Sequence, residues 1–166
     1  MQSDQQEFAR LVREHKSTIY MVCYMFSNDA DEVADLFQEV LIKLWSGFKS
    51  FEGRSAVKTW VYRVALNTCI SLDEKKKRRS KAREQLAMDI DIFTATDRNS
   101  EQARLLHSRI NQLPPLDRAL VLLWLEDISY DEIGAIVGIS LKNVSVRLYR
   151  IRQQLKSMAS PDNNNN

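Results

Sequence analysis

The side chains best suited to recognising a nucleic acid lie near the end of the chain, between residues 140 and 156. On a helix, Val144, Leu148, Ile151 and Leu155 recur at steps of four, three and four, which predicts one buried face. The opposite face and its flanks carry amide, hydroxyl and cationic groups of the kind that bond to base edges and phosphates. The candidate DNA-binding residues of this segment are Lys142, Asn143, Ser145, Val146, Arg147, Tyr149, Arg150 and Arg152.

A shorter helix is expected just before this segment, at 131–137. Gly138 stands where a helix C-cap favours a residue that tolerates positive φ, and Ser140 is placed as the N-cap of the next helix. A short helix, a glycine-centred turn and a second, basic helix predict a helix-turn-helix whose second helix enters a DNA major groove. The pattern therefore indicates duplex DNA as a partner.

A second group of candidate residues surrounds a loop between residues 48 and 55. It combines an aromatic ring, a carboxylate, a glycine, a cation and a hydroxyl, supplied by Phe51, Glu52, Gly53, Arg54 and Ser55. Such a loop could bind an unstacked base. The helix expected at 56–78 places Trp60, Arg63 and Asn67 along one edge, where a ring stacks, a guanidinium holds a phosphate and an amide reads a base edge. Alternatively, Trp60 is a core residue, and the two interpretations agree if one ring face is packed and the other exposed.

The helix expected at 31–47 has an apolar face and an opposite polar face. The apolar face, expected in the core, consists of Val33, Leu36, Phe37, Val40, Leu44 and Phe48. The opposite face presents Asp35, Gln38, Glu39 and Ile42, with Lys43 beside them. A solvated surface is the ordinary interpretation of such a face, whereas an exposed isoleucine with a polar rim is typical of a protein-binding patch.

Length and composition favour an all-α fold of two small helical domains joined by a linker. The chain has 166 residues, 44% of them hydrophobic, with only four glycines and three prolines to support turns between strands. We expect an N-terminal helical domain at 1–80, a linker at 81–100 with a short helix possible at 81–88, a C-terminal helix-turn-helix domain at 101–158 and a disordered tail at 159–166. The further helices are expected at 5–26, 101–112 and 116–126.

The charge distribution agrees with two separate contacts with DNA. Lys and Arg outnumber Asp and Glu by 8 to 3 in residues 61–85 and by 5 to 1 in residues 136–166, although the net charge is only +2. Nothing resembles a metal-ligand cluster, a nucleophile elbow or a phosphate-cradling glycine loop, so no metal, cofactor, small-molecule substrate or enzymatic activity is predicted. Cys23 and Cys69 are expected to be reduced core residues. No signal segment or run of 18 apolar residues is present, so a cytoplasmic protein is expected.

Together these motifs resemble an extracytoplasmic-function (ECF) sigma factor, a small two-domain bacterial transcription initiation factor. The matching stretches are residues 35–40 with 43–45, residues 51–55 with 58–67, the turn at 113–115, and residues 130–134 through 147–155. The resemblance implies that the chain binds core RNA polymerase and directs it to specific promoters. It also implies that the linker threads through the polymerase toward the RNA exit path, and that residues 101–126 bind the flap of the other large polymerase subunit. An anti-sigma partner, often membrane-bound in this family, is also implied by the resemblance.

The resemblance assigns a role to each group of candidate residues. It implies that the polar face of the second helix docks on the clamp helices of the largest polymerase subunit through Asp35, Gln38, Glu39, Ile42 and Lys43. It implies that the loop and third helix take the flipped base and the non-template strand of the −10 element through Phe51, Glu52, Gly53, Arg54, Ser55, Lys58, Trp60, Arg63 and Asn67. The last helix would read the −35 element as duplex.

The recognition helix departs from the family pattern at two positions. The family often has a basic residue followed by a small polar one before an Arg–Leu pair, and here these positions hold Ser145 and Val146. Val146 has no hydrogen-bonding group, but its side chain could contact a thymine methyl. Another function class stays open: a stand-alone helix-turn-helix regulator with an N-terminal sensing domain would bind duplex DNA as a dimer without polymerase.

Overall fold

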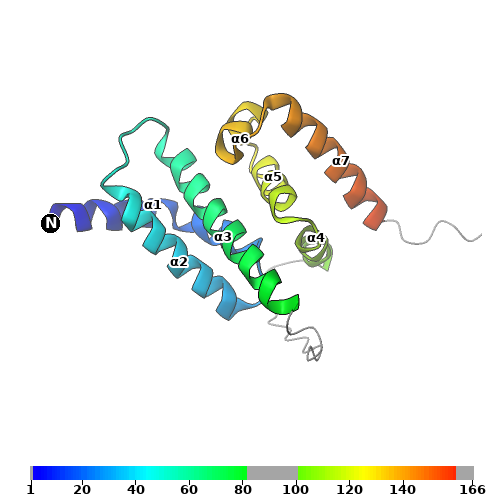
Figure 1. Cartoon of the computed structure of the whole chain (residues 1–166), viewed down its shortest axis with the longest axis horizontal. Coiled ribbons are helices and arrows are strands. Elements are labelled where there is room, and N and C mark those ends of the chain that lie inside the picture. The colour runs from blue at the N-terminus through cyan, green and yellow to red at the C-terminus, as the bar shows by residue number, and fades with distance from the viewer. Residues whose placement is uncertain (1, 82–100, 160–166) are drawn as a thin grey trace, which may run out of the picture. The chain divides into compact units, whose positions relative to one another are not determined.

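The computed structural model describes residues 2–81 and 101–159, which divide into two helical units (Figure 1). Almost all of the predicted linker and tail, and the possible helix at 81–88, lie outside the described residues. Every regular element within those ranges is an α-helix: α1 (Gln2–Tyr24), α2 (Ala30–Phe48), α3 (Val57–Lys81), α4 (Glu101–Asn111), α5 (Pro115–Leu125), α6 (Tyr130–Val137) and α7 (Leu141–Ala159). The predicted all-α fold with two helical domains is confirmed.

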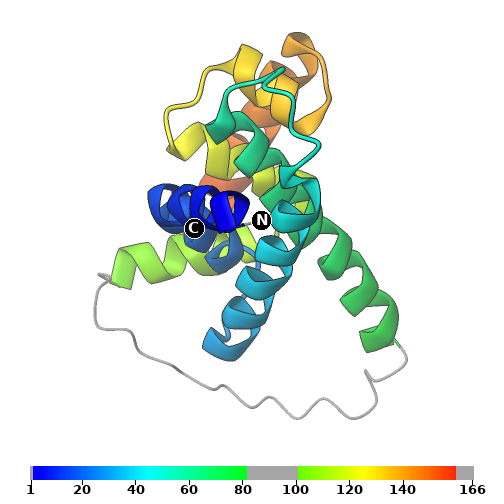
Figure 2. The same ribbon diagram turned by 90° about the vertical axis from the view of Figure 1, so that its left-hand side faces the viewer.

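The first unit is a three-helix bundle in which α1, α2 and α3 each pack against the other two (Figure 2). Of the apolar stripe predicted on the second helix, Val33, Leu36, Val40 and Leu44 are buried in this core, whereas Phe37 and Phe48 are half-buried at its edge. The polar face of α2 is thereby left on the surface. Further buried side chains from α1 and α3 complete the core: Leu11, Ile19, Val22, Cys23, Val61, Tyr62, Ala65, Leu66 and Cys69.

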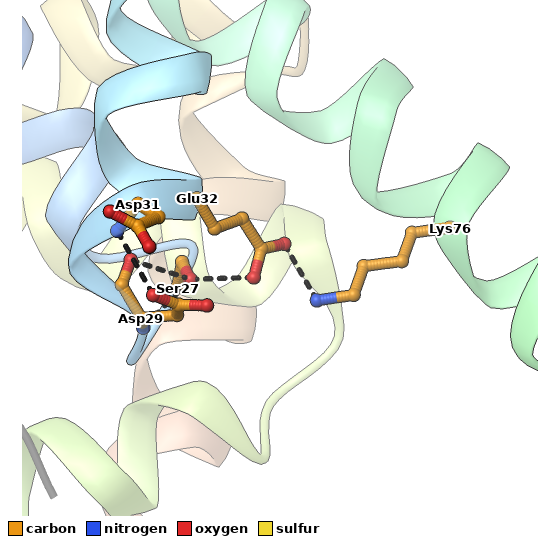
Figure 3. A network of polar contacts seen from close by, with 5 residues as sticks. All are labelled: Ser27, Asp29, Asp31, Glu32 and Lys76. Atoms are coloured by element: carbon orange, nitrogen blue, oxygen red, sulfur yellow. Dashed lines mark hydrogen bonds and ion pairs between the residues drawn. The ribbon is translucent and has the colours of Figure 1, made fainter. Parts of the chain in front are cut away.

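A polar network joins the start of α2 to the later part of α3 (Figure 3). The Asp29 carboxylate caps α2 by accepting from the backbone N–H of Asp31 at 2.9 Å. The buried Ser27 hydroxyl donates to Glu32 Oε2 at 2.8 Å, and Glu32 Oε1 accepts from Lys76 Nζ at 2.6 Å. The network therefore links the α1–α2 turn to a lysine of the basic end of α3.

The second unit is built around α5. Its residues from Arg118 to Leu123 are all buried, and α5 packs against α4, α6 and α7. The turn between α4 and α5 is closed by Arg118, whose Nη2 donates to the carbonyls of Asn111 and Leu113 at 2.9 and 3.0 Å. A buried guanidinium thus satisfies carbonyls that the end of α4 leaves without helical partners.

The helix-turn-helix is formed by α6 and α7, with the caps that the sequence predicts. Gly138 has φ 79° and ends α6, and the Ser140 hydroxyl accepts from the backbone N–H of Asn143 at 3.2 Å. Gly134 lies where the turn folds back on α6, and its carbonyl accepts from the N–H groups of Gly138 and Ile139. A Cβ at Gly134 would lie 2.6 Å from the Ile139 carbonyl oxygen, so this position requires glycine.

Candidate functional site

The recognition helix α7 presents all eight candidate DNA-binding residues on its surface. Val144, Leu148 and Ile151 are buried against the unit, whereas Val146 is 41% and Tyr149 65% exposed. The other exposed candidates are Lys142, Asn143, Ser145, Arg147, Arg150 and Arg152. Buried and exposed residues therefore alternate as the helical period predicts, and the candidate DNA-binding side chains are accessible to solvent.

Two of these arginines also contact α5, which the sequence did not indicate. Arg147 Nη1 lies 3.5 Å from the Asp117 carboxylate, and the Arg152 guanidinium lies 5.1 Å from the centroid of the Trp124 ring. Both contacts join side chains that are far apart in the chain, so no local pattern could have revealed them. Asp117 and Trp124 thus contact two candidate residues although neither was itself a candidate.

An aromatic ring of the loop before α3 stacks on a ring of the first turn of α3. The Phe51 and Trp60 ring centroids are 4.7 Å apart with an interplanar angle of 27°, and both residues are half-buried. Trp60 is therefore packed against Phe51 and keeps part of its surface accessible, so it is neither a fully buried core residue nor a fully exposed ring. The close approach of Gly47 to this ring leaves only 3.3 Å for a Cβ.

Glu52 and Arg54 of the same loop are exposed. Arg54 Nη2 lies 2.8 Å from Glu52 Oε2 in an ion pair whose arginine side chain is 87% exposed, so its contribution to stability is small. Gly53 has φ 69°, a conformation that glycine adopts without strain. Ser55 is half-buried beside these groups.

The first turns of α3 carry the remaining candidates of this region. Lys58 and Asn67 are exposed and Arg63 is half-buried. The Lys58 ammonium lies 5.9 Å from the centroid of the Tyr62 ring. Because Trp60, Arg63 and Asn67 are separated by steps of three and four, they follow one edge of the helix. This edge combines a stacking ring, a cation and an amide.

The polar face of α2 forms a separate surface on the same unit. Asp35, Gln38, Glu39 and Lys43 are exposed, and Ile42 is 56% exposed among them. Trp45, 39% exposed, adds apolar surface one turn further along and packs edge-on against Phe8 at 5.0 Å. The face thus combines two carboxylates with accessible apolar side chains.

The two cysteines lie in the core of the first unit, and both are completely buried. A hydrogen bond with Cys23 and burial raise the pKa of the Cys69 thiol well above its ordinary value. In the part of the chain that the structure describes, no three His, Cys, Asp or Glu side chains are grouped to hold a metal ion. No helix of residues 2–81 or 101–159 is both long and apolar enough to cross a membrane.

Comparison with known proteins places both units in one family. Residues 11–80 match the family model for Sigma-70 region 2, and residues 103–155 match the one for Sigma-70, region 4. The first match covers the polar face of α2, the loop and most of α3, and the second covers the helix-turn-helix.

Curated relatives resemble nearly the whole chain. The ECF RNA polymerase sigma factor SigE of Mycolicibacterium smegmatis is 34% identical over 88% of this chain, which spans 59% of the length of that protein. The ECF RNA polymerase sigma factor SigW of Bacillus subtilis is 30% identical, and the match covers 92% of this chain and 89% of that protein.

Two solved structures share the fold. The sigma factor RpoE of Bartonella quintana, crystallised with the anti-sigma factor NepR, matches 98% of this chain and 99% of that one with a TM-score of 0.74 at 21% identity. CnrH in complex with the cytosolic domain of CnrY matches 95% of this chain and 90% of that one with a TM-score of 0.68, also at 21% identity. With the two region matches and the curated relatives, the chain belongs to the ECF RNA polymerase sigma factors, which are promoter-specific transcription initiation factors.

Proposed function

We propose that this chain binds core RNA polymerase and directs it to promoters by reading the −35 element as duplex and the −10 element as a melted strand. The observation that carries the proposal is that each unit presents exposed residues suited to one form of DNA: α7 for a groove, and the loop with α3 for unstacked bases. We propose domain limits of 1–80 for polymerase and −10 binding and 101–158 for −35 and flap binding, joined by a linker at 81–100.

Reading of the −35 duplex is assigned to the exposed face of α7. Lys142, Asn143 and Ser145 lie in its first turns, the part of a recognition helix that contacts base edges. Tyr149 and Arg150 extend the same face by one further turn. Each well-formed bidentate contact contributes roughly 1–3 kcal/mol of discrimination, so two or three such contacts would select one promoter class.

Capture of the −10 strand is assigned to the loop at 51–55 and to the edge of α3 that carries Trp60. A base stacks on an aromatic ring with roughly 1–3 kcal/mol, whereas an aromatic pair contributes about 0.5–1.5 kcal/mol. A base that displaced Phe51 from Trp60 would therefore offset the loss of that pair. Arg63 and Lys58 would neutralise the phosphates of the captured strand, and Asn67 would contact a base edge.

Docking on core polymerase is assigned to the polar face of α2. An apolar centre at Ile42 with a rim of Asp35, Gln38, Glu39 and Lys43 has the composition of a protein interface. The anti-sigma complexes of the two solved relatives support a further proposal, that an anti-sigma factor holds this chain inactive in the cytoplasm, near the membrane where that partner is anchored.

A run-off assay tests the proposal directly. Core polymerase with the full chain should select genomic fragments that share two sequence elements, and should give a promoter-specific transcript from them. Asp35→Ala combined with Glu39→Ala should weaken capture of core polymerase in a pull-down, whereas the matched pair Glu7→Ala with Glu14→Ala, which removes the same charge from exposed positions of α1, should not.

Two results would contradict the proposal. If the chain bound duplex DNA as a dimer with equal selectivity in the absence of polymerase, the stand-alone regulator would be the better description. If the α2 pair and the α1 pair weakened polymerase capture equally, net charge alone would explain the effect and the assigned docking face would be wrong.

A further inference from the structure

Two side chains of α5 contact arginines of the recognition helix α7. Asp117 and Trp124 are seven residues apart, so they project from nearly the same side of α5. They reach Arg147 and Arg152 of α7, at 3.5 Å for the ion pair and 5.1 Å for the guanidinium over the ring. A cation this close to an indole ring is within the range of a cation–π interaction.

The two arginines approach α5 from opposite flanks of α7. Five residues at 100° each place them about 140° apart around the helix axis, with the buried residues Leu148 and Ile151 between them. A rotation of α7 that shortened one contact would lengthen the other. The pair of contacts therefore opposes rotation in both directions, which a single contact could not do.

A small rotation of α7 would matter for base recognition. Side chains extend to about 6 Å from a helix axis, so a rotation of about 10° moves their tips by about 1 Å. The donor–acceptor distances of good hydrogen bonds span only about 0.5 Å. Base contacts from Asn143 or Ser145 would thus be lost by a rotation of this size.

We infer that Asp117 and Trp124 are positioning residues that set the rotation of α7, acting through Arg147 and Arg152. The inference rests on the proposed reading of the −35 duplex by α7. It gives Arg147 and Arg152 the role of fixing the rotation of α7, whereas the sequence alone had predicted that they contact DNA. Because the Arg147 side chain is 46% exposed and its ion pair with Asp117 is long, that pair adds little to the stability of the fold.

Holoenzyme binding to two duplexes tests the inference. The probes are a promoter fragment recovered with the wild-type holoenzyme and the same fragment with its −35 element scrambled. For Asp117→Asn and for Trp124→Leu, we expect the ratio of the two affinities to fall about five- to tenfold, the discrimination lost with one base contact. The salt dependence of binding should stay unchanged, since no phosphate contact is gained or lost.

Matched variants separate positioning from charge and from folding. Glu126→Gln removes the same charge as Asp117→Asn from an exposed position just after α5 and should leave the ratio unchanged. Trp124→Phe keeps a ring for the guanidinium and should restore most of the ratio lost in Trp124→Leu. Urea unfolding of Asp117→Asn should lie within about 1 kcal/mol of that of the wild type, because Asp117 also stands in the first turn of α5.

Several outcomes would overturn the inference. If Asp117→Asn strengthened binding to both duplexes and steepened the salt dependence by about 0.9, Asp117 would merely be masking a phosphate-binding Arg147. An unchanged ratio in both variants, or no rescue by phenylalanine, would also refute it. Failure of the proposed function is recognised separately, because the wild-type holoenzyme would then bind both duplexes equally.

Discussion

Gly134→Ala should disrupt the helix-turn-helix although it adds only one methyl group. The new Cβ would lie 2.6 Å from the Ile139 carbonyl oxygen, a backbone atom that no rotamer change can move away. Reaching even 3.0 Å requires the turn to shift by about 0.4 Å relative to α6. This turn joins α6 to the recognition helix, so the shift changes the angle at which α7 leaves it.

The cost can be worked out from the contacts at this position. Overpacking costs about 1–3 kcal/mol, and weakening the hydrogen bonds from Gly138 and Ile139 to the Gly134 carbonyl adds about 0.5–1.5 kcal/mol each. Alanine regains about 1 kcal/mol of helix propensity over glycine. The balance is a loss of about 3 kcal/mol, which for a domain of this size lowers Tm by roughly 12–24 °C.

Unfolding of the full chain, followed separately in the two units, measures this effect. Hydrogen exchange of residues 115–159 should accelerate in Gly134→Ala, while labelling of the buried thiols Cys23 and Cys69, which reports the first unit, should keep its rate. Ala135→Gly is the matched control, because it removes one methyl group from the adjacent, exposed helical position and should cost only about 1 kcal/mol.

Two results would contradict the expected destabilisation by Gly134→Ala. If the propensity term dominated, Gly134→Ala would be about 1 kcal/mol more stable than the wild type. A variant as stable as the wild type, with unchanged binding of the −35 duplex, would show that the turn accepts a Cβ without displacement. Either result would refute the assignment of Gly134 as a packing requirement of the helix-turn-helix.

Three further predictions concern side chains outside the candidate DNA-binding surfaces. Arg118→Leu should lower the unfolding free energy by about 2–4 kcal/mol, measured by urea titration, because it leaves two carbonyls of the α4–α5 turn without their buried donor. Glu32→Gln should cost at most about 1 kcal/mol in the same titration, because Lys76 is largely exposed and a glutamine can still accept from Ser27; a larger loss would contradict this. The raised pKa of Cys69 means that the unfolded chain loses this proton first as pH rises, so stability should fall by about 1.4 kcal/mol per pH unit above pH ~9, and Cys69→Ala should flatten that slope.

The exposed faces of α2 and α7 were predictable because they follow from helical periodicity. The buried steps at Val144, Leu148 and Ile151 place Lys142 and Tyr149 on the surface whatever the rest of the chain does. The caps at Gly138 and Ser140 were equally local, since each depends on the conformation of one residue and a hydrogen bond a few residues away. Periodicity and capping act over one or two turns, which a sequence displays directly.

Contacts between elements could not be predicted in this way. The pairs Arg147–Asp117 and Lys76–Glu32 each depend on the packing angle of two helices, which periodicity leaves undetermined. The same limit applies to Phe51, whose stacking on Trp60 depends on the path of the intervening loop. The sequence indicated candidate residues for the DNA-binding surfaces, whereas the structure shows which of these candidates also have partners within the protein.

The contacts between α5 and α7 affect how the small exposed face of α7 would specify a promoter. With Val146 near the centre of the exposed face of α7, the hydrogen-bonding groups available for bases are few. If polymerase holds the two units at a set separation, discrimination at the −35 and −10 elements multiplies, because independent free energies add. Two surfaces that each discriminate by about 2–3 kcal/mol would together separate promoters by roughly a thousandfold or more. Precise orientation of α7 by Asp117 and Trp124 would then matter more than additional phosphate contacts, since those strengthen binding to every sequence alike.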